Sequence, residues 1–329
     1  MDWPEWSKQY SAGDTDYYIY GGPIETSGYR SICETLEKRR NNKKQKVILI
    51  LCTGGGNPNA GYRIARALIH HYGAINFRVA VPAECKSAGT LICIGAHSII
   101  LFDQGELGPL DVQFQKKDEL FQQSSGLDIV RGMTYLKDDA LEAFNKFLLD
   151  INGGSGLGTK VASEIASNLV RGIYEPIFAQ IDPVRLGEMN AALQIAHEYG
   201  TRLNKKSANL KDNALSKLIN NYPTHGFVID RAEARDLFIR VEPPDERVAL
   251  AGKFALDMAW QKGRQTTPNV LDLGEFFEDI FPNETTNDEH ESASQPGAQP
   301  EPTGTAAVTG TNGGQPSQVD EPKQLPNAG

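Results

Sequence analysis

The sequence predicts an α/β fold in which parallel strands alternate with helices, and three observations support that prediction. Residues 47–52 form an unbroken apolar run that follows a lysine-rich turn and stops at glycines, as in a strand buried on both faces. The pattern of strand, turn and helix then occurs twice, over 47–72 and 77–96. Two such units in succession imply parallel pairing and right-handed crossovers.

The spacing of apolar residues gives the order of the elements. In the first part we expect strand 17–20, helix 24–40, strand 47–52, helix 60–72, strand 77–82, helix 91–96 and strand 98–102. The section from about 128 to 221 is mainly helical, with helices expected at 134–151, 160–169, 173–180, 183–203 and 210–219. A short strand at 227–229 and a helix at 232–238 follow, and Ile239-Arg240-Val241 closes that helix before two prolines.

The 329 residues allow one large domain or two ordinary ones. We expect an N-terminal arm over 1–16 and one main domain over 17–282, whose 128–221 part is the helical insertion. Residues 283–329 are rich in Pro, Gly, Ser, Thr, Gln and Asn and carry seven acids against one lysine. Ordering such a segment costs more than burial returns, which predicts a disordered acidic tail.

Composition excludes several classes of function. A formal net charge of −9 argues against nucleic acid as a partner, because wrapping a phosphate backbone needs a basic face. The four scattered cysteines have no metal-ligand spacing, which argues against a zinc site and favours a reduced, cytoplasmic setting. The longest apolar stretch, 91–102, is shorter than the roughly 20 residues of a membrane span. The first 16 residues also lack the apolar region of a signal peptide.

No cofactor is expected. The chain has no dinucleotide-binding fingerprint. The glycine-rich segment 152–160 departs from the phosphate-loop pattern, because Gly158 is followed by Thr-Lys, and it follows a helix instead of a strand.

Two turns are candidates for chemistry, Gly54–Gly56 and Ser87–Gly89. Each follows a strand and precedes a helix, so both are expected at the carboxyl edge of the sheet, where sites form. A serine hydroxyl facing backbone N–H donors is the minimum for acyl transfer, a nucleophile with an oxyanion hole. The plainer interpretation is a helix N-cap beside an ordinary glycine turn. The pairing of the two turns in successive units favours catalysis.

Four segments carry a resemblance to a known family. They are Leu-Cys-Thr-Gly-Gly-Gly at 51–56 with the helix after it, Lys-Ser-Ala-Gly-Thr at 86–90, Gly-Glu-Leu-Gly-Pro-Leu-Asp-Val-Gln at 105–113, and Tyr-Pro-Thr-His-Gly-Phe-Val-Ile at 222–229 with the helix around Ala234. Together they resemble, in the same order over about 17–245, the serine dehydrogenase proteinase family. That family is similar to signal peptide peptidase A and the Clp protease proteolytic subunit, on the crotonase/ClpP-like fold of repeated ββα units. Gly54 stands where the family usually has proline, so a looser turn is expected.

The resemblance implies a serine endopeptidase that cleaves peptide bonds. By it, Ser87 is the nucleophile and the N–H groups of Gly55 and Ala88 form the oxyanion hole. Gly56 keeps the turn open to the substrate backbone. The resemblance also implies a homo-oligomer with peptide or protein substrates.

The general base has several candidates. Signal peptide peptidase A is similar in using a serine–lysine dyad, and its Lys-Asp step corresponds to Lys117, with Lys116 beside it. A solvated charged turn is the competing interpretation of those lysines. Asp111, Lys146 and His225 are the rivals. Asp111 is a poor base because a carboxylate has a normal pKa of about 3.9, so a loop-shaping role fits it better.

Two other functions stay open on the same scaffold. One is a catalytically inactive binding or assembly protein, which the unsettled base and the glycine at 54 favour. The other is an acyl-CoA enzyme of the crotonase class, in which the two N–H groups hold a thioester enolate. The turns have no paired glutamates to act as acid and base, so we rank it last.

Overall fold

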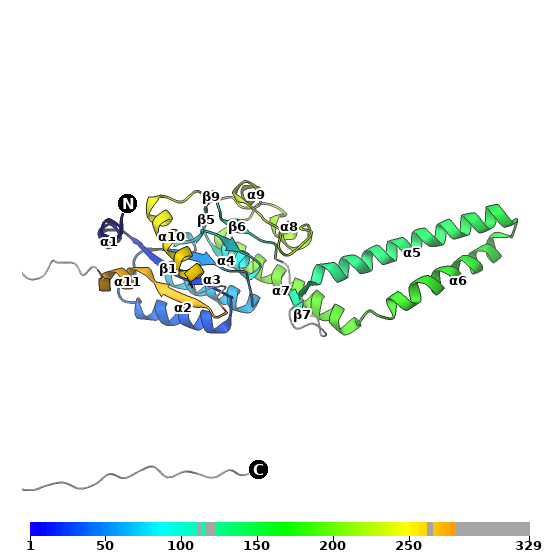
Figure 1. The fold of residues 1–329 in the computed structure, drawn as a ribbon, viewed down its shortest axis with the longest axis horizontal. Helices are drawn as coiled ribbons and strands as arrows, with labels where there is room; N and C mark the ends of the chain where they lie inside the picture. The colour runs from blue at the N-terminus through cyan, green and yellow to red at the C-terminus, as the bar shows by residue number, and fades with distance from the viewer. Residues whose placement is uncertain (111–112, 116–122, 262–265, 281–329) are drawn as a thin grey trace, which may run out of the picture. The chain divides into compact units, whose positions relative to one another are not determined.

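The computed structural model describes residues 1–110, 113–115, 123–261 and 266–280 (Figure 1). The predicted acidic tail, 283–329, lies outside the described residues. A six-stranded sheet forms the centre, in the order β10-β1-β2-β3-β5-β9. Its strands are β1 (Thr15–Gly21), β2 (Lys46–Cys52), β3 (Phe77–Val81), β5 (Ser98–Leu101), β9 (Val241–Glu242) and β10 (Asn269–Asp272). All neighbours pair in parallel except β1 and β10, so the predicted parallel α/β sheet is confirmed.

Helices cover both faces of this sheet. One core cluster joins alternate residues of the strands, such as Leu49, to α2 (Thr26–Lys38), α3 (Pro58–Tyr72), α4 (Ala88–Gly95) and α7 (Pro183–Ser207). The other cluster joins the intervening residues, such as Ile48 and Ile50, to α1 (Trp3–Ala12), α10 (Glu246–Gln261) and α11 (Leu273–Ile280). Burial of both faces explains why β2 is an unbroken apolar run.

A second, smaller layer lies at the carboxyl edge of the sheet. Strands β4 (Glu84–Cys85) and β6 (Glu106–Leu107) pair in parallel there. Isolated bridges extend this layer on both sides, from Thr53 to Cys85 and from Leu107 to Ile229. The layer therefore brings together the glycine turn, the serine turn, the 105–113 segment and the 222–229 segment.

The section predicted to be helical is helical. It holds α5 (Gly126–Ser155), α6 (Thr159–Phe178), α7 and α8 (Ala214–Asn220), and α9 (Arg231–Leu237) follows. The antiparallel strands β7 (Gln113–Gln115) and β8 (Gln123–Ser125) precede α5, and a short 3-10 turn, Ala74–Asn76, precedes β3.

Several predicted boundaries are wrong. The helices expected at 160–169 and 173–180 are one helix, α6, because Gly172 costs a helix only about 1 kcal/mol. The helix expected at 210–219 begins at Ala214, after the left-handed Asn213. The strand expected at 227–229 is reduced to one bridge at Ile229.

The N-terminal and C-terminal segments of the described chain add elements beyond the predicted ones. Residues 1–16, expected as an arm, contain α1, which Asp2 caps by accepting from the Glu5 N–H. Trp6 of α1 is fully buried against the sheet. Near the other end, β10 pairs with β1, and Asp272 accepts the first backbone N–H groups of α11.

Candidate active site

The serine turn holds Ser87 in an unusual backbone conformation. Ser87 lies between β4 and α4 with φ 51° and ψ −112°. A positive φ is uncommon for a residue with a side chain, and such strain persists only where the surroundings enforce it. Ser87 stands at the N-cap position of α4, yet its side chain makes no capping bond to the helix. The plainer interpretation of this serine as a cap is therefore wrong.

The glycine turn lies directly against the serine turn. Gly55 and Gly56 have φ of +107° and +144°, where a side chain is strained. A Cβ built on Gly55 would lie 2.8 Å from the Cβ of Ser87 and 3.5 Å from its Oγ. The same atom would lie 3.1 Å from the carbonyl oxygen of Lys86. The two turns singled out from the sequence therefore meet, and only a glycine fits at position 55.

The two backbone groups predicted as oxyanion donors differ in their surroundings. Ala88 is the first residue of α4, where N–H groups lack a partner within the helix. The Gly55 N–H donates to Oγ1 of Thr53 at 3.0 Å, and the Gly55 carbonyl accepts from the Ile24 N–H at 2.8 Å. Both backbone polar groups of Gly55 are thus hydrogen-bonded.

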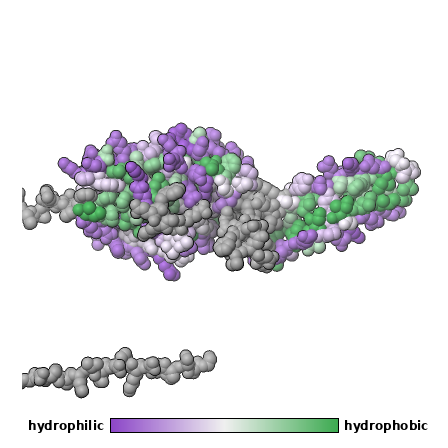
Figure 2. All heavy atoms as spheres, viewed as in Figure 1, coloured by the Kyte–Doolittle hydropathy of each residue, from purple (hydrophilic) through white to green (hydrophobic). Residues whose placement is uncertain are grey.

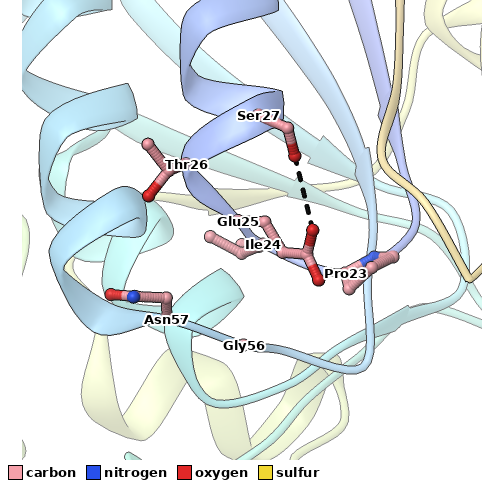
Figure 3. Close-up of a pocket in the computed structure, with 7 residues that line it drawn as sticks. All are labelled: Pro23, Ile24, Glu25, Thr26, Ser27, Gly56 and Asn57. Atoms are coloured by element: carbon pink, nitrogen blue, oxygen red, sulfur yellow. Dashed lines mark hydrogen bonds between the residues drawn. The ribbon is translucent and has the colours of Figure 1, made fainter. Parts of the chain in front are cut away.

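An open pocket of about 460 Å³ adjoins the glycine turn (Figure 3). Its lining residues are Pro23, Ile24, Glu25, Thr26, Ser27, Gly56 and Asn57. Ile24 forms a bridge with Gly56, so the pocket begins one residue from Gly55. The carboxylate of Glu25 accepts a hydrogen bond from the Ser27 hydroxyl at 3.3 Å.

Sequence reasoning missed the role of Lys86, which directly precedes Ser87. Lys86 is 7% exposed. Its ammonium contacts Glu106 Oε1 at 2.7 Å, and it donates to the carbonyls of Phe227 at 3.2 Å and Leu107 at 3.3 Å. The sequence signal that could have found this contact is that Lys86 lies in the 86–90 segment and Glu106 in the 105–113 segment, both of which carry the family resemblance.

The candidate bases are only partly within the described residues. Asp111, Lys116 and Lys117 lie outside them, between Leu110 and β8. Lys146 is exposed on α5, and His225 is half-buried. The 222–229 segment that carries His225 reaches the serine turn through the Phe227 carbonyl.

The buried cysteines near the turn are poor rival nucleophiles. Cys85 and Cys93 are free and buried, with their sulfur atoms 3.8 Å apart. Burial and the neighbouring thiol raise the pKa of Cys85 well above its usual range, and burial raises the pKa of Cys52 to about 12. The reactive thiolate is therefore disfavoured at Cys85 and at Cys52. Within the described part of the chain, no group of His, Cys, Asp and Glu side chains is placed to hold a metal ion.

A strained serine between a strand and a helix, set against a glycine turn at the carboxyl edge of an α/β sheet, defines a serine hydrolase-type site. Residues 31–175 match the model of the ClpP-like SDH-type serine proteinase family. The chain is similar to that family over this segment, and the serine peptidase class predicted from the sequence is confirmed. The matched segment includes Gly55, Ser87 and Lys117 and ends before His225.

Two solved structures of the 1510-N membrane-bound stomatin-specific protease are similar to the chain at low levels. A serine-to-alanine mutant is 16% identical with a TM-score of 0.31, over 46% of this chain and 70% of that one. A lysine-to-alanine mutant in complex with a substrate peptide is 16% identical with a TM-score of 0.30, over 73% and 96%. Curated proteins give no match. Among the helices described, none has both the length and the apolar character to cross a membrane.

Proposed function

We propose that the chain cleaves peptide bonds with Ser87 as nucleophile and Lys117 as general base. The Ser87 Oγ bonds to the substrate carbonyl carbon while its proton passes to the neutral Lys117 amine. The N–H groups of Gly55 and Ala88 hold the carbonyl oxygen as it becomes negative. The C–N bond then breaks, and Lys117 gives the proton to the leaving nitrogen. Water repeats the attack on the acyl-enzyme, releases the carboxylic acid and restores the Ser87 hydroxyl.

The contact between Gly55 and Ser87 carries this proposal. It supports a carbonyl oxygen bound next to the attacking hydroxyl. For Gly55 to act as a donor, its N–H must exchange the Thr53 hydroxyl for the substrate oxygen. The open pocket beside Gly56 supports binding of a substrate side chain next to that oxygen, with Glu25 as its charged group.

Lys117 is proposed from the family resemblance, with Lys116, Lys146, Asp111 and His225 as rivals. A lysine acts as a base near neutral pH only when burial favours its uncharged form. Lys86 is nearer in sequence to Ser87, but its ammonium has an acceptor for each of its three N–H groups. A group held in that way has no lone pair to offer Ser87.

Labelling by a fluorophosphonate probe and cleavage of casein test the assignment. Ser87→Ala should abolish both, whereas the matched Ser31→Ala, at a partly exposed position of α2, should keep both at the wild-type level. Lys117→Ala should lower both rates by at least about 100-fold, and Lys146→Ala should not. Wild-type labelling of the Ser87→Ala protein would refute the nucleophile. Full activity of Lys117→Ala would move the base to a rival.

We also propose a homo-oligomer, supported by the hairpin of α5 and α6. The residues of α6 buried towards α5 include Ala162, Ala166 and Tyr174. A second apolar row, one position earlier in the chain, is 37–49% exposed; it contains Val161, Ile165, Leu169, Ile173 and Ile177. Figure 2 shows hydrophobic side chains along this hairpin.

The exposed row suits a second copy of the same chain. Its residues are four apart, with β-branched residues on both sides of Leu169, so a two-fold axis there places β-branched residues against β-branched residues. The row spans about 24 Å, and i, i+4 ridges of two such helices interdigitate. Glu164 and Arg171 flank the row and are complementary in charge on antiparallel copies.

A cytoplasmic setting is proposed from the thiols. All four cysteines are free, and three of them are buried in the core. Free thiols persist in reducing compartments. Labelling of the protein's thiols in fractionated cell extracts, with and without a reductant, would test this setting.

A further inference from the structure

The ammonium of Lys86 is a buried charge with all of its donors in use. Its side chain is 9% exposed, and its three acceptors belong to two distant parts of the chain. Glu106 and Leu107 form β6, and Phe227 belongs to the 222–229 segment. One side chain therefore joins the serine turn to two of the other segments that carry the family resemblance.

The backbone of Lys86 is fixed as firmly as its side chain. Its N–H donates to the Thr53 carbonyl at 2.9 Å, and its carbonyl accepts from the Gly89 N–H at 2.8 Å. Every polar group of the residue before Ser87 is thus bonded. Because the strained φ of Ser87 persists only if its neighbours enforce it, Lys86 is well placed to do so.

The β6 segment is held against the serine turn at more than one point. A Cβ on Gly108 would lie 2.5 Å from Cδ of Lys86, so the lysine stem lies directly over Gly108. The Thr90 hydroxyl is 2.7 Å from the Gly108 carbonyl, and the Gly108 N–H donates to the Cys85 carbonyl at 3.2 Å. Lys117 follows Gly108 by nine residues in the sequence.

A buried ion pair is weak evidence for stability, because an apolar pair of similar volume stabilises a fold as well or better. We infer that Lys86, through Glu106, is a positioning residue. It fixes the strained Ser87 relative to the segment that leads to the base. This inference rests on the proposed role of Ser87. It requires that loss of the pair lowers kcat and leaves KM nearly unchanged, because the buried ammonium of Lys86 already has all of its donors bonded within the protein.

The test uses the full chain with casein as substrate and separates geometry from folding. Lys86→Met and Glu106→Gln should each lower kcat by about 10–100-fold, with KM within about 2-fold of wild type, and should lower Tm. The double variant Lys86→Met/Glu106→Leu leaves no unpaired charge, so its Tm should return towards wild type. Its kcat should stay low. The exposed pair Lys46–Asp14 provides a matched control, and Lys46→Met should keep both kcat and Tm.

Each other outcome overturns the inference. If kcat recovers with Tm in the double variant, the pair is only structural. If Glu106→Gln keeps the wild-type kcat while Lys86→Met does not, Lys86 acts without the pair. A raised KM at constant kcat assigns Lys86 to binding. Ser87→Ala is measured in parallel: an active Ser87→Ala protein refutes the proposed nucleophile, whereas an inactive one beside a fully active Lys86→Met protein refutes the positioning role alone.

Discussion

Gly55 and Ser87 are in direct contact, since a methyl group on Gly55 would lie 2.8 Å from the Ser87 Cβ. Two features make Gly55 irreplaceable: this contact and its φ of +107°. We expect Gly55→Ala to lower kcat/KM for casein by at least about 100-fold, because the oxyanion donor moves away. Gly54→Ala is the matched control, since a Cβ there meets nothing within 4 Å. Equal activity of the two variants would contradict an oxyanion role for this turn.

The two adjacent arginines that follow α2, Arg39 and Arg40, should differ in how much their replacement lowers the stability of the fold. Nε of Arg39 lies 2.6 Å from a carboxylate oxygen of Asp272, whose side chain is 2% exposed. Arg39→Met leaves that carboxylate buried without its cation and should lower the free energy of unfolding by about 3 kcal/mol. Arg40 pairs with Glu37 at the surface, so Arg40→Met should cost less than about 1 kcal/mol. Urea denaturation measures both, and similar losses would contradict the assignment.

Stability should fall steeply in alkali because tyrosines are buried in β1. Burial raises the pKa of Tyr17 to about 12 and that of Tyr20 to about 12, against about 10 in the unfolded chain. The stability contributed by the neutral phenols is complete below pH 10 and is lost as the pH rises from 10 through 12. Tyr17→Phe should flatten the fall of the urea midpoint between pH 10 and 11. An unchanged slope would show that Tyr17 already ionises near pH 10 in the folded protein, which would contradict the raised pKa.

The apolar row of α6 predicts how the oligomer can be separated. Leu169 lies at its centre and is 45% exposed. Leu169→Glu places a charge at the proposed two-fold axis and should reduce the molar mass in solution, as measured by light scattering. Ser167→Glu, at an exposed position on the opposite side of α6, should leave the mass unchanged. A wild-type protein that is already monomeric would refute the proposed interface.

The core of the fold and the meeting of the two turns were predictable. The apolar run of β2 and the repeated strand–turn–helix pattern determine a parallel sheet, and the geometry of such a sheet puts Gly55 and Ser87 at the same edge. Periodicity failed where the signal was weak. The prediction divided α6 into two helices, at 160–169 and 173–180, although the exposed Gly172 interrupts a helix at little cost.

The role of Lys86 was not predictable from local pattern. A lysine in a turn normally points to water, and its acceptor at Phe227 is 141 residues away in the chain. Trp6 was hidden for a similar reason, because its partner Phe277 belongs to a helix near the far end of the described chain. Contacts of this kind are set by tertiary packing, which residue spacing does not encode.

The bridge from Leu107 to Ile229 and the bond from Lys86 to Phe227 have a consequence for biosynthesis. A nascent chain that has emerged only as far as α8 already contains the serine and the glycine loop, but it still lacks one acceptor of the lysine beside them. On the proposed role of Lys86, proteolytic competence therefore requires synthesis at least as far as Phe227, and a shorter ribosome-bound fragment carries a serine turn that lacks this bond.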